Sequence, residues 1–127
     1  MEWRDLHSFS FGDSPALADE LAALVLAGLK IATCWAAADG PQSAEVGRRM
    51  VMLDGSGKAL AVLEIVELFL RQFNEVDAAF AFDEGEGDRS LACWRQAHRD
   101  YFAGRGQFAE NMLLYCERFR FIERIAE

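Results

Sequence analysis

A turn of small and polar residues separates two apolar, β-rich arms near the middle of the chain. The turn is Asp54-Gly55-Ser56-Gly57, and the arms cover residues 50–53 and 58–70. Two strands joined by so short a turn pair in the antiparallel direction. The sequence therefore predicts a β-hairpin, which any fold proposed for this chain has to contain.

Helical and strand patterns follow one another irregularly on both sides of this hairpin. Ser14 and Pro15 suit a helix start, and Gly28 suits the left-handed position that follows a helix end. The segment 36–46, with its Gly-Pro pair, indicates a loop. The other expected elements are a helix from Pro15 to Gly28, a strand over 31–35, a short helix capped by Asn74 and running through Phe80, a helix over 91–102 and a strand over 112–125.

This order excludes a regular alternation of strands and helices, and with it a doubly wound parallel sheet. It predicts an α+β fold around a small, mostly antiparallel sheet or barrel. The chain has 127 residues, of which 52% are hydrophobic. Residues 1–127 are therefore expected to form a single domain with a hydrophobic core.

Charge and cysteine content narrow the classes of partner. The net charge of −8, from 13 basic and 21 acidic residues, argues against sequence-independent binding to long duplex DNA. It still allows a local cleft for a nucleotide or a short single strand. Cys34, Cys93 and Cys116 form no CxxC pair, which predicts reduced thiols in a cytoplasmic protein and no metal site. We expect no cofactor, because P-loop and GxGxxG motifs are missing, and no membrane association.

Lys30 and Thr33 are the first candidates for chemistry. Lys30 follows the expected helix end at Gly28, and Thr33 follows three residues later. An ordinary lysine at a helix end and a β-forming threonine are the alternatives. In a regular strand these two side chains point to opposite faces, so they converge only if the chain bends after the helix.

The acidic segment 83–88 is the second candidate. It places four carboxylates in six residues, and carboxylates that share a site raise the pKa of at least one of them. Such a group can act as a general acid or base. The alternative is a solvated loop in which Asp88 caps the next helix. His98 shares a helix face with Trp94 and Phe102, which is more typical of a packed histidine than of a catalyst.

Several of these stretches together resemble the ASCH domain family, whose signature is GxKxxT, and in particular its longer bacterial branch. The resemblance covers nearly the whole chain. The segments that carry it are Phe11-Gly12-Asp13, Ala18-Asp19-Glu20-Leu21, Gly28-Leu29-Lys30-Ile31-Ala32-Thr33, Glu84-Gly85-Glu86-Gly87-Asp88, Trp94, His98, Tyr101-Phe102 and Cys116-Glu117-Arg118-Phe119.

The resemblance implies a PUA-like β-barrel with flanking helices and a cleft suited to RNA or a nucleoside. Some members are amidohydrolases of N4-acylated cytidines that use a Lys, a Thr and a Glu, and others are ribonucleases. The Lys and the Thr correspond to Lys30 and Thr33. Glu86 is the first choice for the Glu, and Glu84 the second. Leu29 stands where many members have a second basic residue, which weakens a phosphate-binding role. The residues expected to contact ligand are Gly28, Trp35, Arg49 and Tyr101.

Two functions follow from the resemblance. If the protein is an amidohydrolase, Thr33 attacks the exocyclic amide, and Lys30, with a pKa lowered by burial, accepts the Thr33 proton. Glu86 then transfers protons to and from water and the leaving group. As a ribonuclease or a non-catalytic RNA-binding module, the same cleft holds phosphates with Lys30 and nearby arginines, while Trp35 or Tyr101 stacks on a base. The expected partner is a modified nucleoside or a short single-stranded RNA. A third hypothesis is a regulatory or interaction domain without catalytic activity. A homodimer is compatible with the sequence.

Overall fold

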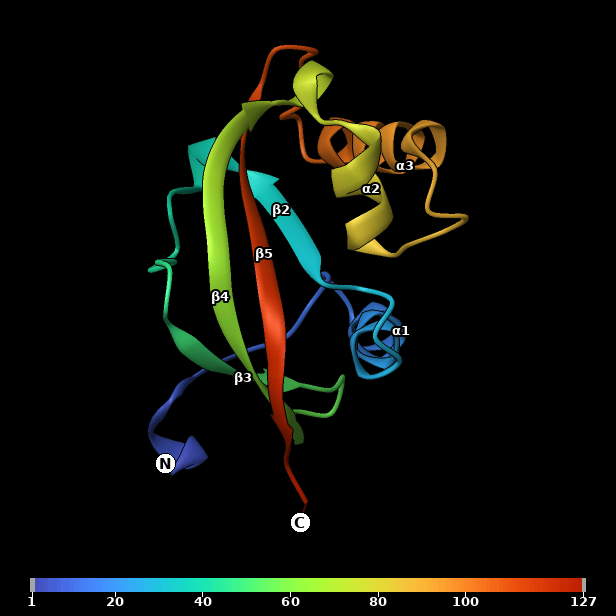
Figure 1. Ribbon diagram of the computed structural model, residues 1–127. Coiled ribbons are helices and arrows are strands. Elements are labelled where there is room, and N and C mark those ends of the chain that lie inside the picture. The colour runs from blue at the N-terminus through green and yellow to red at the C-terminus, as the bar shows by residue number, and fades with distance from the viewer. Residues whose placement is uncertain (1, 127) are drawn as a thin grey trace.

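A computed structural model of the protein describes residues 2–126. Its five strands form one curled sheet, a half-barrel with the order β1-β3-β4-β5-β2. All three α-helices lie on the same side of the long β4–β5 pair (Figure 1). The elements are η1 (Trp3–Asp5), β1 (His7–Phe9), α1 (Pro15–Leu26), β2 (Ala32–Ala36), η2 (Ala37–Asp39), β3 (Arg49–Leu53), β4 (Ala59–Gln72), η3 (Phe73–Glu75), α2 (Ala78–Glu84), α3 (Leu91–Gly104) and β5 (Leu113–Arg124).

The expected hairpin is confirmed as β3 and β4, which pair antiparallel. In its turn, a carboxylate oxygen of Asp54 accepts hydrogen bonds from the backbone N–H groups of Ser56 and Lys58, at 2.8 and 2.9 Å. Strand β4 then pairs with β5 along its length, and the register shifts twice, near Leu63 and near Val66. Such irregularities bend paired strands, which explains how two such long strands curl into a half-barrel.

Two features differ from the sequence expectations. Strand β1 was not expected, and it pairs parallel to β3 while the other three pairings are antiparallel. The short helix begins after Asp77, whose side chain accepts from the Phe80 N–H at 2.9 Å, so the expected cap at Asn74 is wrong. Asn74 instead lies in η3, a turn held by a capping box between Gln72 and Glu75.

The helices pack on the sheet in two separate hydrophobic clusters. Helix α1 packs its buried Leu21 and Val25 near Phe119 of β5. Helices α2 and α3 pack Phe80, Trp94 and Phe102 near Leu114 and Cys116, closer to the start of β5. Between residues 2 and 126, no helix is both long and apolar enough to cross a membrane.

Candidate functional site

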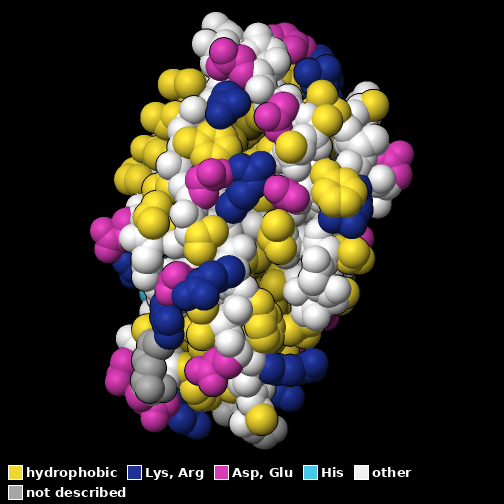
Figure 2. Space-filling view, in the orientation of Figure 1, with side chains coloured by type: hydrophobic (Ala, Val, Ile, Leu, Met, Phe, Trp, Pro, Cys, Tyr) yellow, Lys and Arg dark blue, Asp and Glu magenta, His cyan; other side chains and the backbone are white. Residues whose placement is uncertain are grey.

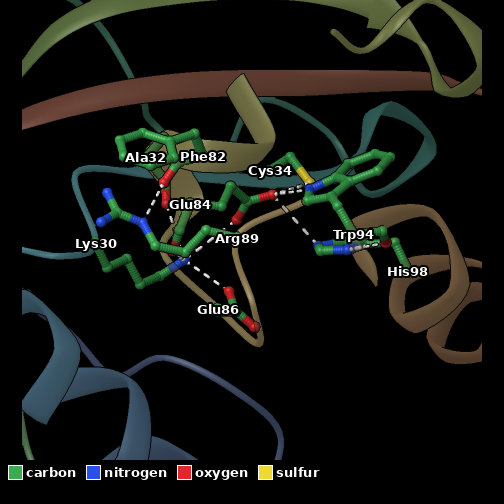
Figure 3. Close-up of polar contacts among 9 residues, drawn as sticks. All are labelled: Lys30, Ala32, Cys34, Phe82, Glu84, Glu86, Arg89, Trp94 and His98. Atoms are coloured by element: carbon green, nitrogen blue, oxygen red, sulfur yellow. Dashed lines mark hydrogen bonds and ion pairs between the residues drawn. The ribbon is translucent and has the colours of Figure 1, made fainter. Parts of the chain in front are cut away.

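Lys30 lies in the connection between α1 and β2, after the expected left-handed turn at Gly28, which has a φ of 78°. Its side chain is 1% exposed. The ammonium donates to the Ala32 carbonyl at 2.8 Å and contacts carboxylates of Glu84 at 3.1 Å and Glu86 at 2.8 Å (Figure 3). A buried ammonium is stable only when it is paired in this way. The buried lysine therefore joins the chain after α1 to the end of α2.

Glu84, the last residue of α2, is the second buried charge of the site. One carboxylate oxygen faces Lys30, and the other accepts from the Trp94 indole N–H at 2.6 Å and lies 3.3 Å from His98 Nε2. Burial alone would raise the pKa of Glu84. The Lys30 charge and the hydrogen bonds from His98 and Trp94 outweigh burial and lower that pKa to about 2. Glu84 is therefore ionised and links the lysine to α3.

Two contacts of His98 with oxygen atoms favour its protonated form. Its Nδ1 lies 2.9 Å from the Trp94 carbonyl oxygen, and its Nε2 faces the Glu84 carboxylate. Both of these oxygens can only accept, so both ring nitrogens have to carry a proton. Burial alone would lower the pKa of His98, but the interactions with Glu84 raise it. The His98 ring is stacked on the Trp94 ring at 4.3 Å, and its protonated form places a second positive charge beside Glu84.

Two sequence expectations about charge are wrong. Burial alone would lower the pKa of Lys30, but the Glu84 and Glu86 carboxylates raise it, so Lys30 is a cation and not a neutral base. Of the four carboxylates in the acidic segment 83–88, only those of Glu84 and Glu86 meet in one site, at Lys30, because Asp83 pairs with Arg118 at 2.9 Å and Asp88 accepts from the Ser90 N–H. The pKa values of Glu84 and Asp88 are accordingly lowered rather than raised.

The cap of α3 differs from the alternative considered for this segment. The Ser90 hydroxyl, rather than Asp88, accepts from the Cys93 N–H at 3.0 Å at the start of α3.

One group of side chains in the described part of the chain could share a metal ion. It consists of Cys34, Glu84 and His98, whose possible ligand atoms all lie within 4.8 Å of one another. The contacts of these three side chains favour bound protons over a bound metal ion. Burial raises the pKa of the Cys34 thiol well above its usual value, and Glu84 already accepts from Trp94. A metal ion would need the thiolate and would compete with these donors. The cluster is satisfied as a hydrogen-bond network.

Two adjoining hollows open beside Lys30, each with a volume of about 300 Å³. Thr33, Trp35 and Tyr101 line both of them. Together they reach the size typical of small-molecule sites, about 300–1,000 Å³. The first hollow, which we call the lysine hollow, is also lined by Lys30, Cys34, Glu84, Glu86 and His98. The second, which we call the Glu117 hollow, is also lined by His7, Asp39, Arg48, Arg105 and Glu117.

Six of the eight residues selected from the sequence therefore surround one cleft: Lys30, Thr33, Trp35, Glu84, Glu86 and Tyr101. Gly28 lies in an exposed turn outside it, and Arg49 of β3 pairs with Glu64 of β4 at 2.9 Å. Lys30 and Thr33 line the same hollow because Lys30 precedes β2 and its side chain folds back to the Ala32 carbonyl. The chain does bend after the helix, as their convergence requires.

Glu117 is the residue that sequence reasoning missed. It lies on β5 directly opposite Thr33, and it is 4% exposed. No hydrogen bond or ion pair to its carboxylate is found among residues 2–126. Burial raises its pKa to about 7, although the Lys30 charge acts in the opposite direction. A glutamate within the apolar pattern of the last strand was the available signal.

Gly85 sets the spacing between the acidic segment and the lysine. It ends α2 with a φ of 74°, and a Cβ there would lie 2.2 Å from the Leu29 carbonyl oxygen. Gly85→Ala is expected to destabilise the fold by at least about 1–2 kcal/mol, since the left-handed conformation alone costs that much. Chemical denaturation measures the change. Gly104→Ala is the matched control, because a Cβ at this α3 residue meets nothing within 4 Å. Equal stability of both variants would contradict the prediction.

The curled half-barrel, with a cleft between its sheet and its helices around a buried lysine, defines a class of small α+β domains. The chain belongs to the ASCH domain family, whose family model matches residues 7–123. The crystal structure of an ASCH domain from Lactobacillus crispatus JV V101 is similar, with a TM-score of 0.82 and 34% identity over 91% of this chain and 79% of that one. A protein structure from Enterococcus faecalis V583 has a TM-score of 0.80 and 27% identity over 93% of this chain and 77% of that one. A comparison with curated proteins found no match.

Proposed function

We propose that this protein hydrolyses the exocyclic amide of an N4-acylated cytidine, with Thr33 as the nucleophile. The observation that carries the proposal is the lysine hollow, where a buried ammonium, its two carboxylate partners and the Thr33 hydroxyl line one cavity. Hydroxyl nucleophiles in amide cleavage work beside a proton acceptor and a charge that stabilises the oxyanion. The lysine hollow holds the hydroxyl, the positive charge and two carboxylates together.

The aromatic walls of the cleft support a planar ligand. Trp35 stacks on Tyr115 with ring centres 5.5 Å apart, and its indole N–H donates to the Gly40 carbonyl at 2.8 Å, which fixes the ring. Tyr101 lines the same space from α3 and is 41% exposed. Aromatic faces of this kind stack on nucleobases. The ring of a cytidine is therefore a suitable occupant.

Lys30 and Glu86 have distinct roles in the proposed reaction. The Lys30 ammonium is a cation, so it stabilises the developing oxyanion rather than accepting the Thr33 proton. Glu86 binds it through Oε2, and its side chain is 34% exposed, which leaves the other oxygen accessible to water. This carboxylate takes a proton from the water that attacks the acyl-Thr33 ester and returns it to the Thr33 oxygen as the ester bond breaks.

Charge pairing makes RNA binding less favourable than a small neutral ligand. The Lys30 ammonium already contacts two carboxylates and two carbonyl groups. Figure 2 shows basic and acidic side chains side by side on the face over β4 and β5, without a broad basic area on that face. Tight binding to a chain of phosphates needs several unpaired basic groups, whereas a single nearby positive charge is enough to stabilise an oxyanion. RNA binding is therefore the alternative function, and the cytidine-release experiment distinguishes it from amide hydrolysis.

Release of cytidine from N4-acetylcytidine tests the proposal. We expect the wild type to release cytidine, Thr33→Val to lose at least about 100-fold in kcat/KM, and the wild type to accumulate an acetyl group on Thr33 by mass spectrometry. Ser8→Ala, which removes an exposed hydroxyl from β1, is the control and should keep full activity. No cytidine release by the wild type, or equal rates in Thr33→Val, would refute the proposal. Binding of short RNA without cytidine release would favour the alternative function.

A further inference from the structure

We infer that Glu117 is a catalytic residue of this cleft: its carboxylate takes the Thr33 hydroxyl proton as the acyl-Thr33 ester forms. This inference rests on the proposed amide hydrolysis, and it assigns the proton acceptor that Lys30 cannot be. The family signature and the acidic segment 83–88 do not include Glu117.

Position is the first argument. Glu117 and Thr33 are directly opposite in the antiparallel β2–β5 pair. Such partners share a face of the sheet, with Cβ atoms about 4.5–5.5 Å apart. Both side chains line the Glu117 hollow, so the same accessible space reaches the carboxylate and the hydroxyl. A carboxylate facing a hydroxyl at this spacing comes within hydrogen-bond reach through side-chain rotation alone.

The lack of any partner is the second argument. Buried carboxylates are nearly always hydrogen-bonded, and a buried one without a partner needs an explanation. Glu117 is 4% exposed as a residue and has no hydrogen bond among the described residues, whereas Glu84, at 1%, has several. The Glu117 carboxylate oxygens are not among the fully buried side-chain atoms that lack a partner, so they reach the accessible space of the hollow. Arg48 lines the same hollow, and its Nε–H is the one buried side-chain polar atom without a partner among the described residues. This hollow thus offers both an unused acceptor and an unused donor, as expected of a site that awaits a ligand.

The charge state suits a proton acceptor that works near neutral pH. Burial raises the pKa of Glu117 to about 7, and Lys30 is the one charged group that acts on it appreciably. General bases are most effective when their pKa is close to the working pH. The other titratable or charged residues that line the Glu117 hollow are His7 of β1, Cys34 of β2, Asp39 of η2, Arg48 before β3, Tyr101 of α3 and Arg105 after it.

The acylation step balances with these groups. The Thr33 Oγ1 forms a bond to the acyl carbon as its proton moves to Glu117, and the resulting oxyanion is stabilised by the Lys30 charge. The bond from the acyl carbon to N4 then breaks, and Glu117 passes the proton to N4, so that cytidine leaves with a neutral amine. The acyl group stays on Thr33 until water, activated by Glu86, releases it as a carboxylic acid.

Glu117→Gln tests this role, because it keeps the size of the side chain and removes its basicity. With N4-acetylcytidine, we expect kcat to fall at least about 100-fold with KM changed by less than about three-fold. Glu117→Asp keeps the carboxylate and should retain more activity. The wild-type profile of kcat/KM should fall as the pH drops below about 7, and this fall should disappear in the residual activity of Glu117→Gln. Glu123→Gln, an exposed glutamate on the same strand, is the control and should behave as wild type.

A second readout separates this inference from the choice of substrate. The activated ester p-nitrophenyl acetate can acylate Thr33 without any nucleoside, and mass spectrometry detects the acetyl group. We expect acylation in the wild type and in Glu123→Gln, and a large loss in Glu117→Gln. Equal acylation in Glu117→Gln, no acylation in the wild type, or a defect confined to KM overturns the role of Glu117. Wild-type acylation by the ester without any release of cytidine refutes only the proposed substrate.

Discussion

Glu84→Gln should lower the free energy of unfolding by about 3–5 kcal/mol at pH 7, the usual cost of breaking a buried ion pair from one side. The side chain of Lys30 is 1% exposed and that of Glu84 is 2% exposed. The substitution leaves the ammonium with Glu86 as its one remaining carboxylate. It also removes the negative charge that His98 and the Trp94 indole contact. The thiol of Cys34 also donates to this carboxylate, so four side chains lose part of their electrostatic support.

The pH dependence of this loss has a definite sign. The pKa of Glu84 falls from 4.5 to about 2 on folding. A carboxylate with a lowered pKa stabilises the folded state above the unfolded value, and that stability is lost as the pH falls through the folded value. At about 1.4 kcal/mol per pKa unit, the shift corresponds to about 3 kcal/mol. The difference between wild type and Glu84→Gln should be full above pH 5 and shrink toward pH 2.

Urea denaturation at a series of pH values measures this difference. Glu67→Gln is the matched control, since Glu67 also pairs with a basic residue, Arg118, but its side chain is 50% exposed. Exposed pairs contribute about 0–1 kcal/mol, so this variant should stay close to wild type. A loss at pH 7 in Glu84→Gln no larger than that of the control would contradict the assignment of a buried, ionised Glu84.

The stability of Glu117→Gln is expected to change in the opposite direction. Burial raises the pKa of Glu117 from 4.5 to about 7. Between these values the folded protein holds a proton that the unfolded chain has released, so stability falls as the pH rises and the loss is complete above pH 7. The shift corresponds to about 3 kcal/mol. Gln has no charge to desolvate, and the variant should be about 3 kcal/mol more stable than wild type at pH 8.

The same denaturation series tests this second prediction. Glu117→Gln and the wild type should have similar stability below pH 4.5, and the advantage of the variant should grow as the pH rises to 8. Glu123→Gln should show no such trend. A variant that is less stable than wild type at pH 8 would mean that the Glu117 carboxylate has a partner in solution. Greater stability with less activity is the usual trade-off at a functional site.

The elements that depend on local signals were predictable from the sequence. The hairpin turn at Asp54 and the Ser14-Pro15 helix start appear where they were expected. The helix cap at Asp77 was missed because Asn74 carries an equally good capping side chain, and only the η3 turn decides between them. Strand β1 has three residues, and its pairing with β3 comes from tertiary contact rather than from local pattern.

For the candidate site too, some features were predictable from the sequence and others were not. The GxKxxT segment and the acidic stretch identified Lys30, Thr33, Glu84 and Glu86, and all four line one hollow. Their protonation states could not be predicted, because a pKa depends on which charges lie within a few ångströms. Burial alone pointed to a neutral lysine, whereas the two carboxylates keep it charged.

The sequence by itself determined the α+β class, the hairpin and the left-handed turn at Gly28 that places Lys30 after a helix. These features depend on turn residues and on periodicity, which act over a few neighbouring positions. The tertiary structure alone decided that Glu84 lies between a lysine and a histidine, and that Glu117 lies opposite Thr33. Strand register brings residues 84 positions apart onto one face, and no local pattern in the sequence encodes that pairing.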